Sequence, residues 1–386
     1  MLSMKLNLIQ PALSALVLGL LSCGANPESS SAPKTFSLEI IDSVQVDYLG
    51  EMMLLDYDPK AEKYLLATDE PWEYLEVDAR GKILNHNKFS SDGIDVVNYP
   101  ASLGYFNGDV TVLNNIKGYY MFQDSSKVGE ISIPYPFQIM MKNPKLGLFE
   151  SGNKIFYPQP IPGSLSMSNL DEFFRGLYRL PIIESQDKTT GETLGALILP
   201  ETSVVLNDQV HGFPIPVYTM DQEKLLLGLG IEPRFYVYKK EGDQFSYEKT
   251  VEVDIPDWIA YTPAPMDNPK QFLIDNQKKR PGSLTNIFVV DDYYLAIYNR
   301  GISEEVVAQL DPAARYGLGA LKKDSNYAAI FDKDFNQLAT NVPFPITSNY
   351  PMVVNNDDEL VVSKVAGLSE TEDDGIILYK LKLTVQ

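Results

Sequence analysis

Short apolar runs separated by polar turns recur along the chain from residue 36 onward. The 23 tyrosines and 17 phenylalanines fall mostly within these runs, and Gly, Pro, Asn and Asp bound them. Runs of this length and composition are typical of β-strands. Only residues 170–176 and 304–310 favour helix, and both stretches lie in segments that we expect to be loops. The pattern therefore predicts an all-β protein.

The strands recur in one order, four at a time. In the first set, runs at 52–57 and 64–68 flank a polar turn, and runs at 72–78 and 82–89 follow. The second set has Asn107-Gly108 between its first two runs, which is the strongest short signal for a hairpin. Sets of this kind begin near Met52, Leu103, Leu146, Val217, Ile287 and Met352. Repeats of four strands indicate a β-propeller.

The last set is one strand short, and residues 36–46 form a strand that belongs to no set. Pairing that strand with the run at 376–381 would complete the sixth sheet and remove the exposed sheet edges. We therefore predict a six-bladed β-propeller of four-stranded antiparallel blades over residues 36–386, with the last blade closed by the N-terminal strand. A pair of β-sandwich domains is the alternative, because short strands and turns also suit a sandwich.

Cys23 is the one cysteine of the chain and directly follows an apolar run at 12–21. Lys5 precedes the run and the small residue Ser22 ends it, as in a secretory signal. We interpret residues 1–22 as a lipoprotein signal peptide and Cys23 as the lipid-attachment residue. The small, polar and proline-bearing residues that follow predict a flexible tether over 23–35.

The formal net charge of −20 disfavours nucleic acid and anionic lipid headgroups as partners. Membrane attachment would then depend on the acyl chains of Cys23. We expect a lipid-anchored protein of the cell envelope, at the outer membrane because Gly24 stands where an aspartate would favour inner-membrane retention. The periplasmic and the outer face both stay open.

Few residues suit the common catalytic centres. The two histidines are His86, in a predicted outer strand, and His211, in a polar loop. No nucleophile elbow or glycine-rich phosphate loop is present, and the acidic runs at 357–359 and 370–374 lack the ligand spacing of a calcium loop. We therefore expect no cofactor, no metal site and no assigned catalytic residue.

Cationic and bulky residues recur in the connections between the second and third strands of the sets. We letter the four strands of each blade A to D, from the centre of the propeller outward. The B–C loops then lie on one face together with the D–A connections between blades, and the A–B turns lie on the other face. Rigid scaffolds concentrate binding residues on such loops. The predicted site, a pocket for an anionic or sugar-like ligand, consists of Trp72, Lys117, Arg175, His211, Arg234, Arg300 and Lys364. The alternative is that these are surface residues paired with neighbouring carboxylates.

A resemblance to a known family rests on two features, the cysteine motif and the blade sequences. Residues 74–83 are an example of the latter, with an aromatic strand followed by a turn and an amphipathic strand. Over residues 36–383 the chain resembles the six-bladed propeller-like lipoproteins of Bacteroidetes-type bacteria, in particular the family known as domain of unknown function 4221. The resemblance implies architecture and no catalytic residues. We expect a binding or scaffold module for a peptide, glycan or protein partner. The alternative is a hydrolase or lyase that acts on a carbohydrate or anionic substrate in the propeller funnel.

Overall fold

The computed structural model describes residues 34–93, 96–138, 145–311, 322–346, 352–368 and 374–386. The chain divides into two units, Met1–Thr35 and Phe36–Gln386, and all the strands described below belong to the second. Cys23, the predicted signal peptide and most of the predicted tether lie outside the described residues. Among the described residues, no helix is both long and apolar enough to cross a membrane.

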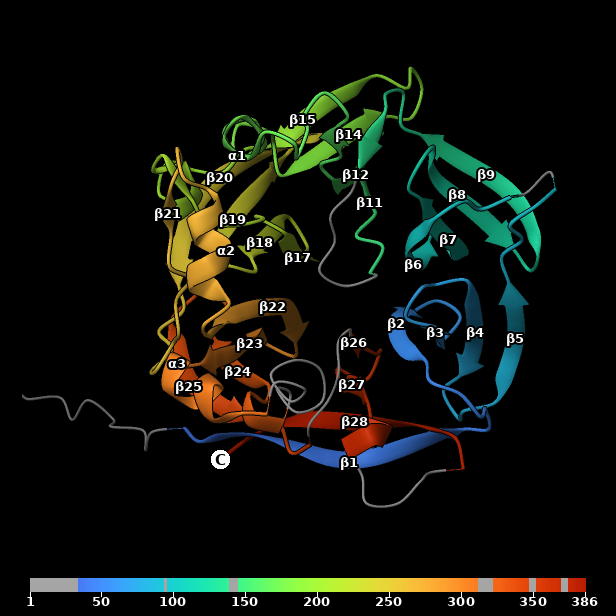
Figure 1. Cartoon of the computed structure of the whole chain (residues 1–386). Helices are drawn as coiled ribbons and strands as arrows, with labels where there is room; N and C mark the ends of the chain where they lie inside the picture. Colours follow the sequence, from blue (N-terminus) through green and yellow to red (C-terminus); the bar gives the residue numbers. More distant parts are fainter. Residues whose placement is uncertain (1–33, 94–95, 139–144, 312–321, 347–351, 369–373) are drawn as a thin grey trace, which may run out of the picture. The chain divides into compact units, whose positions relative to one another are not determined.

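Six four-stranded antiparallel sheets surround a common centre in the unit Phe36–Gln386 (Figure 1). The predicted six-bladed propeller is therefore confirmed. In strand order A to D, sheet 1 has β2 (Met53–Asp58), β3 (Lys63–Ala67), β4 (Glu73–Asp78) and β5 (Ile83–Lys88). Sheet 2 has β6 (Pro100–Phe106), β7 (Asp109–Asn114), β8 (Gly118–Gln123) and β9 (Ser126–Ser132). Sheet 3 has β11 (Phe149–Ser151), β12 (Lys154–Pro158), β14 (Ile183–Asp187) and β15 (Thr193–Leu197).

The second half of the unit repeats this order. Sheet 4 has β17 (Pro216–Asp221), β18 (Lys224–Leu229), β19 (Arg234–Glu241) and β20 (Gln244–Glu252). Sheet 5 has β22 (Arg280–Val290), β23 (Tyr293–Ile302), β24 (Tyr327–Phe331) and β25 (Gln337–Pro343). Sheet 6 has β26 (Val353–Val354), β27 (Leu360–Ser363), β28 (Ile376–Val385) and β1 (Phe36–Val46), so the first strand is the outer strand of the last sheet, as predicted.

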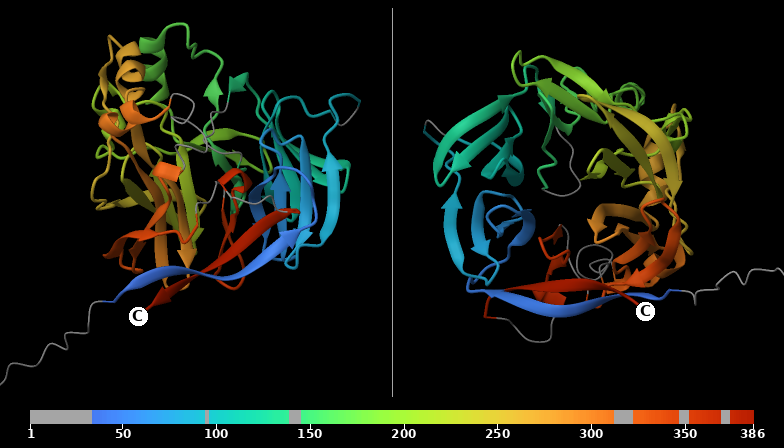
Figure 2. Two further views of the ribbon diagram at one scale, coloured as in Figure 1. Left: turned by 60° about the horizontal axis from the view of Figure 1, so that its bottom comes forward. Right: turned by 180° about the vertical axis from the view of Figure 1, so that it is seen from behind.

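The connections carry the remaining elements. Helices α1 (Leu170–Leu177) and α3 (Glu304–Gln309) confirm the two predicted helical stretches, whereas α2 (Lys270–Asn276) was not predicted. Two short ribbons, β10 (Phe137–Gln138) with β13 (Ile161–Pro162) and β16 (Gln209–Val210) with β21 (Ala264–Pro265), were not predicted either. The green and orange helices lie together on one side of the sheets (Figure 2).

The core is divided among the interfaces between neighbouring sheets. Five clusters of buried apolar side chains each join two consecutive sheets, from sheets 1 and 2 around to sheets 5 and 6. The remaining cluster joins sheet 6 to sheet 1 through residues such as Val46 and Leu54, both fully buried. Burial of apolar area is the dominant favourable term in folding, so the closure of sheet 6 onto sheet 1 stabilises the whole ring.

Strand β1 serves two of these interfaces. Phe36 and Leu38 pack between sheets 5 and 6, whereas Val44 and Val46 pack between sheets 6 and 1. All four residues have even numbers and would share one face of a regular strand. An irregularity in the pairing between Ile40 and Asp42 adds one residue and inverts the alternation, so each half of β1 reaches a different core.

Candidate functional site

The structure places the predicted site residues in the connections expected for them. Trp72, Lys117, Arg175, Arg234, Arg300 and Lys364 lie in or at the ends of the six B–C connections, and His211 lies in the D–A connection between sheets 3 and 4. We call the face of the ring that carries these connections the loop face. Arg175 lines a small cavity with Arg179 and Asp208, and none of the other predicted residues lines it.

Two of the predicted cations already have carboxylate partners. The Arg175 Nε atom lies 2.7 Å from Asp171 Oδ1, and its Nη1 atom lies 2.6 Å from Asp208 Oδ1. Arg234 lies 3.5 Å from a Glu232 oxygen and 3.4 Å from a Glu252 oxygen. The charge of both arginines is therefore balanced within the protein, as the alternative interpretation of these residues expects.

The other predicted residues have varied surroundings. The Arg300 guanidinium lies 4.5 Å from the centre of the Tyr327 ring and donates a hydrogen bond of 2.9 Å to its hydroxyl. Trp72 and Lys364 are half-buried and Lys117 is exposed. His211 is buried, its Nε2 atom lies 2.8 Å from Asn207 Oδ1, and burial lowers the pKa of its imidazole. A role of these residues in ligand binding stays a prediction.

A buried carboxylate at the loop face forms a site that the sequence did not reveal. Glu184 is the second residue of β14, and it is 6% exposed. It lies at the edge of a cavity of about 480 Å³, which we call the acid pocket. The other residues that line this pocket are Tyr135, Pro136, Gln159, Pro162, Gly163 and Ser164.

Three neutral donors hold the Glu184 carboxylate. The hydroxyls of Tyr135 and Tyr157 each donate to it at 2.7 Å, and Gln159 Nε2 donates at 3.3 Å. Burial, followed by the hydrogen bond to Glu184 and then its charge, raises the pKa of both tyrosines, so they remain protonated donors. Within the described part of the chain, no lysine, arginine or histidine forms an ion pair with Glu184, although a buried charge is usually paired.

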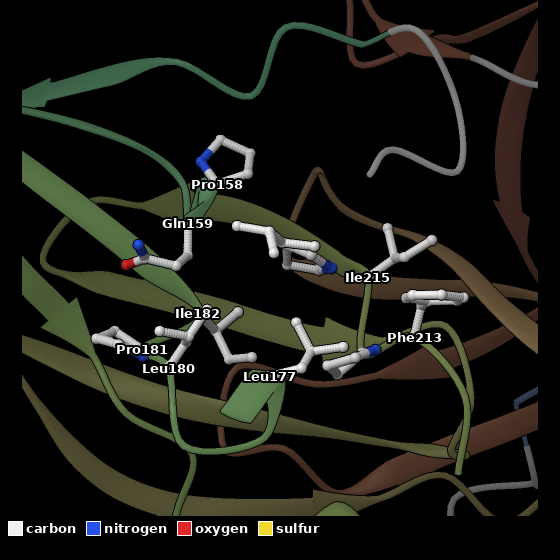
Figure 3. Close-up of a pocket in the computed structure, with 11 residues that line it drawn as sticks. Pro158, Gln159, Leu177, Leu180, Pro181, Ile182, Phe213 and Ile215 are labelled. Carbon is white, nitrogen blue, oxygen red and sulfur yellow. The ribbon is translucent and has the colours of Figure 1, made fainter. Parts of the chain in front are cut away.

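An apolar pocket adjoins the acid pocket through Gln159, which lines both. This apolar pocket, of about 40 Å³, lies between sheets 3 and 4. Its walls come from Pro158, Ile161, Leu177, Leu180, Pro181, Ile182 and the segment 213–216. Figure 3 shows the Gln159 amide on the side of Pro181, with Phe213 and Ile215 on the opposite side. The Gln159 Oε1 atom is buried and accepts no hydrogen bond among the residues described.

A third cavity lies among the inner strands, and we call it the central pocket. Its volume is about 650 Å³, within the range of small-molecule sites. Its walls include the A–B turns of sheets 1 and 2, the segment 145–149 that leads into β11, and residues 218–220 of β17. Two oppositely charged residues, Asp56 and Lys145, line it together.

Desolvation acts on both of these charges. Burial raises the pKa of Asp56, and the Lys145 charge and two backbone amides oppose that rise. Burial likewise lowers the pKa of Lys145, and the Asp56 charge opposes that decrease. Both groups are therefore shifted toward their neutral forms. Among the described residues, no group of three or more His, Cys, Asp or Glu side chains could hold a metal ion in this pocket or elsewhere.

Comparison with known proteins supports the fold. The sequence matches no protein-family model and no curated protein. The structure is similar to that of a member of the DUF4221 family from Bacteroides vulgatus ATCC 8482, with 13% sequence identity, a TM-score of 0.65, and coverage of 91% of this chain and 99% of that chain. A protein from Bacteroides fragilis NCTC 9343, named as an exported protein, is similar with 12% identity, a TM-score of 0.54 and coverage of 90% and 95%. The expected resemblance is confirmed at the level of the fold.

Proposed function

We propose that this protein is a lipid-anchored envelope protein whose loop face binds a peptide through a free amino group. The observation that carries this proposal is the acid pocket, where Glu184 is buried without a cationic partner among the described residues and faces a cavity of about 480 Å³. The propeller would act as a binding module, displayed on a membrane by lipid at Cys23.

The chemistry of the acid pocket favours an ammonium group. The Glu184 carboxyl group accepts hydrogen bonds from two tyrosines and a glutamine, and its oxygens have lone pairs beyond these three bonds. The free Gln159 Oε1 atom supplies a second acceptor nearby. The net charge of −20 would attract a cationic ligand and repel an anionic one. An ammonium group accepts no hydrogen bonds and donates three, which complements this arrangement.

The neighbouring apolar pocket favours a peptide over an isolated amine. Its walls are proline, leucine, isoleucine and phenylalanine, and its volume of about 40 Å³ admits no more than a small apolar side chain. Because Gln159 lines both pockets, one ligand could place an amino group beside Glu184 and a small apolar side chain in the apolar pocket. A peptide with a free amino terminus and a small apolar side chain next to it presents both of these groups.

The proposal predicts that binding requires the Glu184 charge. In a binding screen, short peptides with a free amino terminus should be enriched over the same peptides acetylated at the terminus. For an enriched peptide, Glu184→Gln should weaken binding by about 2 kcal/mol, or roughly thirtyfold in Kd, because a charge-assisted hydrogen bond is lost. Isothermal titration calorimetry measures both effects.

Glu192→Gln is the matched control, since Glu192 is exposed in the turn between β14 and β15 and the substitution changes the net charge equally. It should leave the affinity within about twofold. Equal affinity of free and acetylated peptides, or equal loss in both variants, would contradict the proposal. Unfolding curves of the Glu184→Gln protein show whether the tyrosine contacts at this position still support the fold.

Anchoring is tested separately through Cys23. With a clickable fatty acid supplied to cells that make the protein, the wild type should become labelled and fractionate with membranes. Cys23→Ser should lose the label and appear in the soluble envelope fraction, because no acyl chain remains to bury in the bilayer. Membrane association of the unlabelled variant would contradict the lipid anchor. Protease treatment of intact cells then decides between the periplasmic and the outer face.

The enzymatic alternative has one observation in its favour. Asp56 and Lys145 converge in the central pocket, and groups with shifted pKa values in a cavity are typical of active sites. This pocket contains none of the residues of the predicted ligand site.

A further inference from the structure

Lys145 holds a defined position in the central pocket. It forms a bridge to Leu103 of β6, and its Nζ atom lies 5.5 Å from the centre of the Phe288 ring on β22. The segment that follows is fixed by Tyr218, whose hydroxyl donates a hydrogen bond to the Gly147 carbonyl. A lysine from the entry to sheet 3 thus reaches the inner strands of sheets 2 and 5. This amine is restrained, half-buried and part of the lining of an open cavity.

Asp56 is also fixed in the lining of this pocket. A pairing irregularity between Leu54 and Asp56 redirects its side chain, and the backbone amides of Tyr57 and Tyr105 donate to it at 2.9 and 2.8 Å. Gly104 makes the arrangement possible, because a Cβ atom there would lie 2.8 Å from Asp56 Oδ2 and 2.7 Å from Leu146 Cβ. The fold therefore positions a carboxyl group and an amine to face the same space.

We propose that Lys145 captures small aldehydes or ketones in the central pocket by forming an imine, with Asp56 as the proton donor. The Nζ lone pair forms a bond to the carbonyl carbon, and the carbonyl oxygen takes a proton to give a carbinolamine. The nitrogen passes a proton to the hydroxyl oxygen, the C–O bond breaks as the nitrogen lone pair forms the C=N bond, and the oxygen leaves as water. The product is an iminium ion, and one proton is consumed overall.

The surroundings suit the chemistry and suggest the ligand class. Reaction needs a neutral amine, and a lysine in a desolvated site is activated in this way. A carboxyl group with a raised pKa retains a proton that it can donate. The other groups that line the pocket include Tyr57, Asp58, Lys60, Tyr105, Asn107 and Thr219. Their hydroxyl, carboxylate and amide groups favour a carbonyl compound that carries hydroxyl groups.

Reductive trapping tests this proposal on the purified, full-length protein. Glycolaldehyde is the probe, cyanoborohydride at pH 7 reduces any imine to a stable amine, and peptide mass spectrometry measures the adduct at each lysine after a short pulse. Lys145 should be labelled at least about tenfold faster than Lys60, because even one unit of lowering of a lysine pKa raises the neutral fraction tenfold. Lys60 is the matched control, since it is exposed and lines the same pocket.

Two further measurements sharpen the result. The difference between Lys145 and Lys60 should vanish in protein unfolded by urea, and Lys145→Arg should lose the fast adduct while the labelling of Lys60 persists. Labelling of Lys145 no faster than that of Lys60 in the folded wild type would overturn the proposal, as would a preference that survives unfolding. Neither measurement depends on the peptide site at Glu184, so the two proposals fail independently.

Discussion

A chain that begins at residue 47, and so lacks β1, is expected to lose cooperative folding. The truncation removes four side chains that the structure buries between sheets: Phe36, Leu38, Val44 and Val46. Each contributes about 1.5–3 kcal/mol by burial, so the total is comparable to the ~5–15 kcal/mol that stabilises a typical domain. It also exposes the edge of β28, which invites aggregation. Urea unfolding followed by circular dichroism measures the loss.

A chain that begins at residue 34 is the matched comparison, because it keeps β1 and lacks only residues outside the described structure. It should unfold cooperatively. A synthetic peptide of residues 34–48 added to the shorter chain should restore part of the stability by pairing with β28. Identical unfolding midpoints for the two chains would show that β1 does not close the ring in solution.

Arg234→Met is expected to destabilise the protein by about 2 kcal/mol at pH 7. Arg234 is the cation near Glu232, which is 2% exposed, and breaking a buried pair leaves an uncompensated charge. The expected cost is below that of a fully buried pair because the Arg234 side chain is 20% exposed. Methionine keeps much of the apolar stem, so the change tests mainly the charge. Urea unfolding of the variant and the wild type measures the difference.

The pH dependence identifies the cause of this loss. Burial raises the pKa of Glu232, and Tyr236 and the Arg234 charge oppose the rise. An acid whose folded-state pKa is raised loses stability as the pH rises from its unfolded value, about 4.3, through the folded value. Without Arg234 the folded pKa rises further, so the cost should be largest at pH 7 and shrink near pH 4.

Glu252→Gln is the control for this prediction. It removes the exposed partner of Arg234 and should cost less than about 1 kcal/mol. A cost for Arg234→Met that does not change between pH 7 and pH 4 would exclude the Glu232 charge as its origin. The expected loss also means that an alanine scan of the predicted ligand residues must separate binding from folding at Arg234.

The architecture could be predicted from the sequence because it depends on local patterns. Turn residues such as Asn107-Gly108 mark the hairpins, and alternating apolar runs mark the strands. The closure of the ring could be predicted by counting strands, because the last set lacked one strand and the strand at 36–46 belonged to no set. The irregularity between Ile40 and Asp42 could not be predicted, because it depends on which face of β28 each half of β1 must match.

The candidate sites were harder to predict from the sequence than the architecture. Glu184 and Asp56 each lie in a predicted strand, and a carboxylate in a strand cannot be distinguished from an ordinary surface residue until its tertiary partners are known. The donors to Glu184 come from three separate segments, at Tyr135, Tyr157 and Gln159. Cationic residues in loops were easier to identify from the sequence. Arg175 and Arg234 nevertheless pair with carboxylates, and some of these carboxylates lie far from the arginines in the sequence.

The position of β1 also sets an order of events during biosynthesis. Its partner β28 is the last strand of the unit Phe36–Gln386, so β1 has no neighbour in its sheet until β28 has been synthesised. The sixth blade cannot assemble on a partial chain, and premature locking of the ring is thereby avoided. Completion of the sixth blade is therefore the last folding step open to a nascent chain of this unit.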